Sequence, residues 1–308
     1  MPLTYAPRRT ARSRYIDIRG LNYHLTTWGH HRPGGPPPLL MMHGFMDVGA
    51  SFQFVVDALP DGFAQTRQVI APDWRGFGLS TLPHATDAYW FADYLGDLDA
   101  LVDELSPDAP IDLLGHSMGG GVVMTYAGVR PERVRRLINL EGFGLPDLPA
   151  DEAGPRMARW LDELKSPKRL RPYASLADVA ARLRQNNPRL SDDKAQFLAG
   201  HWSALGEDGQ WHLRADSAHK RINPVPYRAA EAVAIWRRIS APTLWVQGDK
   251  TATERWWRGR YSQAEFQQRL AVVPQVTQVL LSDAGHMLHH DQPQALAGAI
   301  GDFLNPPA

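Results

Sequence analysis

One short stretch limits the possible folds more than any other, since residues 111–121 read Ile-Asp-Leu-Leu-Gly-His-Ser-Met-Gly-Gly-Gly. The apolar run that ends at Leu114 predicts a buried strand, and the apolar stretch 122–129 predicts a helix. The Gly-x-Ser-x-Gly sequence between them predicts a sharp turn from which the hydroxyl of Ser117 projects. Glycine flanks the serine because a Cβ would clash where strand and helix approach each other.

The rest of the chain repeats this alternation of strand and helix. Short apolar runs predict strands at 39–42, 68–71, 111–114, 134–140, 243–246 and 277–281, and an N-terminal hairpin at 15–28 that turns at Arg19-Gly20. Helical periodicity is found at 89–105, 232–239, 264–273 and 293–304. Such alternation favours an α/β fold with a mainly parallel sheet and helices on both of its faces.

The middle of the chain differs from both ends. Residues 146–231 contain no convincing strand and are rich in Arg, Asp and Pro, with helical patterns at 153–163, 176–185 and 192–202. We therefore expect a core formed by residues 1–145 and 232–308, and a helical cap, or lid, formed by residues 146–231.

Composition excludes several classes of protein. The 308 residues include 33 basic and 33 acidic side chains, which gives no global field for nucleic acid or an anionic membrane. The chain has no cysteine, so disulfides, thiol catalysis and Cys-ligated zinc are excluded. No apolar run approaches the ~20 residues that span a bilayer. The basic segment 1–14 has no apolar core, and we expect it to be a disordered tail rather than a targeting segment.

Polar residues directly follow the apolar runs, namely His43, Asp73, Ser117, Glu141, Asp249 and His286. In open α/β sheets, ligands bind outside the carboxyl ends of the strands, so these residues are candidates for one site. A serine nucleophile needs a base, and the base needs an orienting acid. His286 is the candidate base because it follows the last core strand.

The other histidines receive supporting roles. We expect His43 and His116 to shape the pocket by hydrogen bonding, and His289 and His290 to be surface or supporting groups. The backbone N–H groups of Phe45 and Met118 are the expected oxyanion hole, because one follows an early strand and the other follows the serine.

These motifs together resemble the α/β-hydrolase superfamily, in the branch with a helical cap inserted after the sixth strand. The resemblance lies in His43-Gly-Phe, in Asp73-x-Arg-Gly-x-Gly-x-Ser80, in the serine motif and in Ala284-Gly-His286. In most relatives the acid follows the seventh strand, but Thr251 stands there in this chain. In some haloalkane dehalogenases the acid follows the sixth strand instead. Glu141 has that place, 141 − 117 = 24 residues after the serine. We predict Glu141 as the acid, with Asp249 and Glu254 as alternatives.

The resemblance implies a function as well as a fold. A serine at the elbow implies an acyl-enzyme, and an aspartate in its place would imply a dehalogenase or an epoxide hydrolase. We expect a cytoplasmic carboxylesterase that acts on a small to medium, partly apolar ester without metal or cofactor. Its partner is a small-molecule substrate, not nucleic acid. The alternatives are a carbon–carbon bond hydrolase, a perhydrolase and a non-catalytic ligand-binding protein.

Two further groups of residues are interpreted structurally or left open. Asp73, Arg75 and Ser80 predict a turn held by its own ion pairing, with no part in chemistry. Tryptophans in the insertion, at 160, 202 and 211, either line an apolar substrate cleft or pack the cap onto the core.

Overall fold

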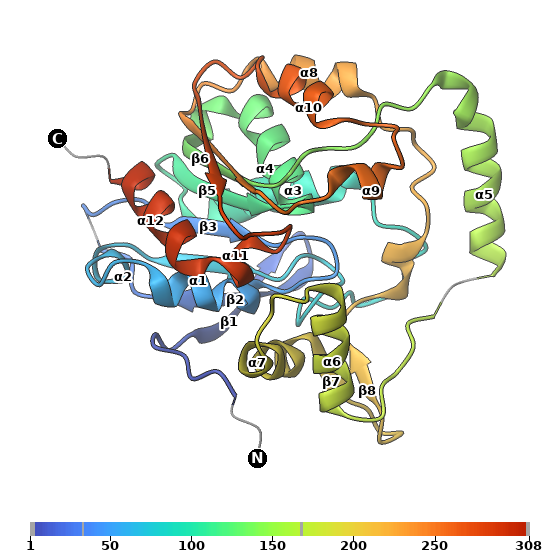
Figure 1. Cartoon of the computed structure of the whole chain (residues 1–308), viewed down its shortest axis with the longest axis horizontal. Coiled ribbons are helices and arrows are strands. Elements are labelled where there is room, and N and C mark those ends of the chain that lie inside the picture. The colour runs from blue at the N-terminus through green and yellow to red at the C-terminus, as the bar shows by residue number, and fades with distance from the viewer. Residues whose placement is uncertain (1–3, 33, 167–168, 306–308) are drawn as a thin grey trace.

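The computed structural model describes residues 4–32, 34–166 and 169–305, and it is built around one sheet of eight strands (Figure 1). The strands lie in the order β1-β2-β4-β3-β5-β6-β9-β10. Their bounds are β1 Arg12–Ile18, β2 Leu21–Trp28, β3 Leu39–Met42, β4 Val69–Pro72, β5 Ile111–His116, β6 Val134–Leu140, β9 Thr243–Gly248 and β10 Val276–Leu281. β2 pairs antiparallel with both of its neighbours, β1 and β4. All other neighbouring strands in the sheet pair in parallel. The predicted mainly parallel sheet is confirmed.

Helices cover both faces of this sheet. On one face lie α1 Gln53–Ala58, α2 Phe63–Thr66, α11 Leu288–Asp291 and α12 Pro293–Leu304. On the other lie α3 Phe91–Leu105, α4 Met118–Val129, α8 Ala229–Trp236 and α10 Gln263–Leu270. The central strands are buried from both sides, which explains why β3 is uninterrupted Leu-Leu-Met-Met instead of alternating with polar residues. Burial of these side chains is the main stabilising term of the core.

The N-terminal hairpin forms as predicted. Ile18 pairs with Leu21 across a two-residue turn in which Arg19 and Gly20 have φ angles of 54° and 75°. Positive φ at both central positions is what a type I′ hairpin turn requires, and glycine adopts it without strain.

The segment before this hairpin does not form the expected disordered tail. Within the described residues, Tyr5 packs edge-on against Phe54 at 4.8 Å between ring centroids and donates from its hydroxyl to Asp57 at 2.9 Å. The backbone N–H groups of Arg8 and Arg9 also donate to Asp57, at 3.0 and 2.7 Å. One carboxylate on α1 therefore holds this segment, a long-range contact that no local pattern in a basic segment indicates.

Residues 146–231, for which the sequence predicts a helical cap, contain both helices and strands. The helices are α5 Ala153–Lys165, α6 Leu176–Asn186 and α7 Asp192–Trp202, and α5 runs along one side of the molecule, apart from the other two (Figure 1). Short 3-10 turns are η1 Gly49–Phe52 and η2 Pro131–Arg133 in the core, and η3 Ala150–Glu152 and η4 Ser217–Lys220 in this region.

The expectation of no strand in the insertion was wrong. The antiparallel strands β7 Ser203–Leu205 and β8 Trp211–Leu213 follow α7 and are joined by a turn in which Gly209 has a φ of 72°. Strands of three residues are too short to show a period-2 pattern in the sequence, so the helical pattern of the neighbouring residues dominated the interpretation.

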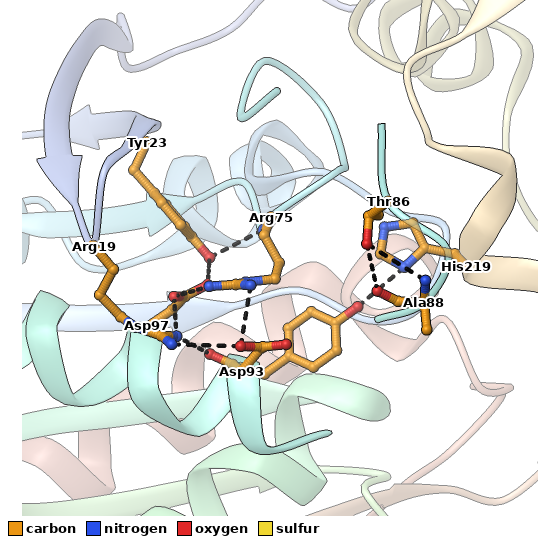
Figure 2. Close-up of polar contacts among 9 residues, drawn as sticks. Arg19, Tyr23, Arg75, Thr86, Ala88, Asp93, Asp97 and His219 are labelled. Atoms are coloured by element: carbon orange, nitrogen blue, oxygen red, sulfur yellow. Dashed lines mark hydrogen bonds and ion pairs between the residues drawn. The ribbon is translucent and has the colours of Figure 1, made fainter. Parts of the chain in front are cut away.

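The turn after β4 is structural, as predicted, but its ion pairing is not internal. The guanidinium of Arg75 forms two hydrogen bonds to Asp97 on α3, and the hydroxyl of Tyr23 donates to the same carboxylate at 2.7 Å (Figure 2). Arg19 donates to it at 2.9 Å, and Asp97 is fully buried. This network joins α3, the hairpin and the turn. Burial beside Asp97 raises the pKa of Tyr23, so its hydroxyl remains a donor.

Candidate active site

Ser117 lies on the turn from β5 to α4 with φ 52° and ψ −113°, a region that residues with a Cβ rarely occupy. Such strain costs about 1–3 kcal/mol and persists only where the surrounding structure imposes it. Here the backbone N–H of Ser117 donates to Leu140 O at 2.8 Å. A Cβ on Gly115 would lie 2.4 Å from Gly119 O, and one on Gly119 would lie 2.3 Å from Met42 O. Both glycines are therefore required for strand and helix to close around the serine.

The loop after β10 brings His286 to this serine. Its Nε2 lies 2.9 Å from Ser117 Oγ, and its Nδ1 lies 2.8 Å from Glu141 Oε2. With these partners the imidazole donates from Nδ1 to the carboxylate and accepts from the hydroxyl at Nε2, a tautomer assigned from the hydrogen bonds. The carboxyl ends of β5, β6 and β10 thus bring together the three side chains that the sequence singled out.

Glu141 is 1% exposed and has a φ of 55°. Its second oxygen, Oε1, accepts hydrogen bonds from Gly248 N at 2.7 Å and from Thr251 Oγ1 at 2.6 Å. Thr251 occupies the position at which the family resemblance implies the acid. It does not orient the imidazole, but it donates to the carboxylate that does, so the loop after β9 still contributes to this hydrogen-bond chain.

The structure does not bring Asp249 to the imidazole. Its carboxylate accepts from Ala284 N at 3.3 Å and lies 3.1 Å from Lys250 Nζ, on the exposed side of the loop. The other alternative, Glu254, belongs to α9 Thr253–Trp257, but its side chain lies outside the described residues.

The backbone expected to form an oxyanion hole passes beside the serine. A Cβ on Gly44 would lie 3.2 Å from Ser117 Cβ, so the peptide that leads into Phe45 runs directly past Ser117. Met118 is the first residue of α4, where backbone N–H groups have no partner within the helix. Among the described residues, neither the Phe45 nor the Met118 N–H donates a hydrogen bond. The positive end of the α4 dipole also favours negative charge there.

His43 and His116 both have structural hydrogen bonds. His43 Nδ1 donates to Gly44 O at 2.7 Å while its Nε2 accepts from Trp74 N at 2.8 Å, which fixes the loop after β3. His116 Nε2 donates to His286 O at 2.8 Å and supports the loop of the imidazole. Burial lowers the pKa of each ring, so both are neutral at neutral pH. His289 and His290 are 0% and 3% exposed, so neither is a surface group.

Comparison with known proteins assigns the family. The sequence model for the alpha/beta hydrolase fold matches residues 37–293. The chain belongs to the alpha/beta hydrolase family. A "Serine hydrolase-like protein" of Danio rerio is 25% identical over 91% of this chain and 84% of that protein. The "sn-1-specific diacylglycerol lipase ABHD11" of Mus musculus is 24% identical over 99% and 92%, respectively. The solved "Thioesterase Domain From Curacin Biosynthetic Pathway" is 28% identical, with a TM-score of 0.78 over 94% of this chain and 99% of that one.

These findings confirm the predicted α/β-hydrolase fold and show that the protein is a hydrolase. Across the described ranges, none of its helices combines the length and the apolarity needed for a membrane crossing.

One residue beside this candidate site was not predicted from the sequence. The ring of Trp256, on α9, lies edge-on to His286 at 4.4 Å between ring centroids and is 46% exposed. The available signal was the Trp-Trp pair shortly after β9. Trp202 and Trp211 pack against the buried cluster that α6 and α7 form with Phe54 of α1, which is the packing role that the sequence left open. Trp160 contacts Trp90 at 6.4 Å between ring centroids.

Proposed function

We propose that the protein is a serine hydrolase that works through an acyl-enzyme, and that its substrate is a small to medium, partly apolar carboxylic ester. In this proposal Ser117 is the nucleophile, His286 is the base and Glu141 is the acid. The supporting observation is the continuous chain of two hydrogen bonds, 2.9 and 2.8 Å, from the serine hydroxyl through the imidazole to a buried carboxylate.

The reaction has two halves. Ser117 Oγ attacks the ester carbonyl carbon while His286 Nε2 takes its proton, and the carbonyl oxygen becomes an oxyanion. The N–H groups of Phe45 and Met118 are aimed to stabilise that charge. When the tetrahedral intermediate collapses, the imidazolium returns the proton to the departing alcohol. Water then attacks the acyl-enzyme by the same route and releases the carboxylic acid.

Glu141 stabilises the imidazolium that forms in each half. The carboxylate is buried, so its attraction for the imidazolium is less screened than it would be in water. Because Gly248 N and Thr251 Oγ1 occupy its Oε1, only Oε2 is directed at His286. The imidazole is thereby kept in the tautomer that can accept the serine proton.

The substrate class is argued from the aromatic side chains beside the site. Phe45 and Trp256 are 48% and 46% exposed although both are large and apolar. Exposed apolar surface beside a catalytic group is typical of a ligand-binding region. The names of the relatives, a lipase and a thioesterase, support acyl transfer at a carbonyl carbon. We further propose that residues 146–231 act as the lid, and that the protein is cytoplasmic, a location with which a chain without cysteine is compatible.

The test combines a covalent probe with a substrate panel. A fluorophosphonate should label the protein once, at Ser117 in a peptide map, and p-nitrophenyl esters of graded acyl length should be hydrolysed alongside matched thioesters. Absence of labelling would refute the serine mechanism. Labelling without turnover of any ester or thioester would refute the esterase assignment and favour the carbon–carbon hydrolase alternative.

Trp256→Ala should alter substrate preference more than it alters chemistry. Its ring contacts the base but makes no hydrogen bond in the triad, so the variant should lose activity mainly on longer or aromatic acyl groups. We expect a change of about tenfold in the kcat/KM ratio of a long to a short ester, which corresponds to burial of one or two methylene groups. Trp202→Ala is the matched control, because that ring packs against the buried cluster that joins α6 and α7 to Phe54 on α1. It should lower Tm and leave the ratio unchanged. Equal losses on all esters for Trp256→Ala would contradict this role.

A further inference from the structure

Three buried side chains that have no part in the proposed mechanism come together beside the loop that carries His286. They are Asp47 after β3, His116 at the end of β5 and His289 on α11, and they are 2%, 1% and 0% exposed. One potential ligand atom from each lies within 4.8 Å of the other two. The rings of His116 and His289 also contact each other, with 4.4 Å between centroids.

This cluster has donor atoms that the protein itself does not use. Asp47 accepts from Val48 N and from Ser51 Oγ, each at 2.8 Å, yet among the described residues no lysine or arginine pairs with it. His289 Nε2, the ring atom that faces this carboxylate, has only long contacts, at 3.5 Å to Ser51 Oγ and 3.6 Å to Asp47 Oδ2. The Nδ1 atoms of His116 and His289 have no hydrogen-bond partner in the described part of the chain. A buried carboxylate and two buried imidazoles without full partners are costly for the fold.

We propose that Asp47, His116 and His289 form an inhibitory binding site for a transition-metal dication such as Zn²⁺. Two imidazoles and one carboxylate are the donor set that Zn²⁺ and its neighbours in the first transition row prefer. Mg²⁺ and Ca²⁺ require more oxygen ligands than this cluster offers. The dication also supplies the positive charge that the buried Asp47 carboxylate lacks. The site is separate from the proposed catalysis, which needs no metal.

The contact that couples this site to catalysis is the hydrogen bond from His116 Nε2 to His286 O, 2.8 Å long. Ligand atoms around a tetrahedral zinc lie about 3.3 Å apart. The ligand atoms lie within 4.8 Å of one another, and the pair His289 Nε2 and Asp47 Oδ2 is 3.6 Å apart, so the side chains draw closer together when the metal binds. Movement of His116 shifts the carbonyl that it holds, and with it the imidazole that must reach Ser117. The metal would thus act from behind the site without entering the substrate cleft.

Binding is tested by spectroscopy, so that the result does not depend on the proposed function. Co²⁺ titrated into Ser117→Ala should produce the visible d–d bands of tetrahedral cobalt at one equivalent, and Zn²⁺ should abolish them. His289→Gln and Asp47→Asn should each weaken binding by at least tenfold. His289→Cys keeps a ligand atom and should retain the bands, which separates a lost ligand from a lost fold. His212→Gln is the matched control, because His212 forms an exposed pair with Asp208 at 3.0 Å.

Inhibition is tested on the unmodified enzyme. Zn²⁺ should lower kcat for a p-nitrophenyl ester at unchanged KM, and His289→Gln should need at least tenfold more Zn²⁺ for the same loss. Cobalt bands that persist in both His289→Gln and Asp47→Asn, or that disappear in His212→Gln, would overturn the site. If the cobalt titration is repeated on the unmodified enzyme, bands abolished by prior fluorophosphonate labelling of Ser117 would place the metal on His286 instead. Binding without any loss of kcat would overturn the inhibitory role.

Discussion

Ser117→Ala should lower the turnover of the best p-nitrophenyl ester by roughly 10⁶-fold, the loss seen when the nucleophile of other serine triads is removed. The reason is that the Ser117 hydroxyl lies 2.9 Å from an imidazole that is itself bound to a buried carboxylate. The variant should also fail to react with the fluorophosphonate. Both are measured on purified protein, as initial rates and as labelled mass.

Thr125→Ala is the control that isolates the hydroxyl at the elbow. Thr125 lies on the same helix, and its hydroxyl donates only to Gly121 O, at 2.9 Å. We expect activity within a few-fold of the unmodified enzyme for this control. Both variants should keep a cooperative thermal transition, since alanine at 117 retains the Cβ that already occupies the strained turn. More than a few per cent of residual activity in Ser117→Ala would show that the nucleophile lies elsewhere.

Much of the fold could be predicted because central strands of a parallel sheet are buried on both faces. Their residues are then uninterrupted apolar runs, as in β3 and β5, and the polar residue that ends each run marks the carboxyl edge of the sheet. Ser117, Glu141 and His286 were found by that rule together with the elbow motif. The structure brings these three side chains into hydrogen-bond contact, and their chemical roles stay proposals until the variants are measured.

What could not be predicted depends on contacts between residues distant in sequence. Arg75 pairs with Asp97 on α3, and the N-terminal segment is held by Asp57, and neither partner is marked by local periodicity. Trp256 was missed because α9 has only five residues, too few to show a hydrophobic period. The sequence indicates that Thr251 cannot orient an imidazole as a carboxylate does, but it does not show the hydrogen bond from Thr251 to Glu141, which requires two loops distant in sequence to meet.

Glu141→Gln should lower turnover by about 10⁴-fold, the loss known when the acid of a serine triad is replaced by its amide. Folding should be kept, because glutamine has the same shape and the site stays buried. Asp249→Asn is the matched control, since that carboxylate contacts Ala284 N and Lys250 and not the imidazole. It should lose less than about tenfold. Glu254→Gln completes the set and should behave like Asp249→Asn.

The size of the expected loss follows from the donors around Glu141. The backbone N–H of Gly248 can only donate, and it lies 2.7 Å from Oε1, so the amide of a glutamine must turn its oxygen toward Gly248. The NH₂ group then takes the place of Oε2, where it meets His286 Nδ1. To accept from that NH₂, the imidazole must move its proton to Nε2, and it can no longer take the proton of Ser117. The rates of the three variants, measured at one pH with folding checked by circular dichroism, show which carboxylate is the acid. If Asp249→Asn lost most of its turnover and Glu141→Gln kept nearly all of it, the acid would belong to the loop after β9.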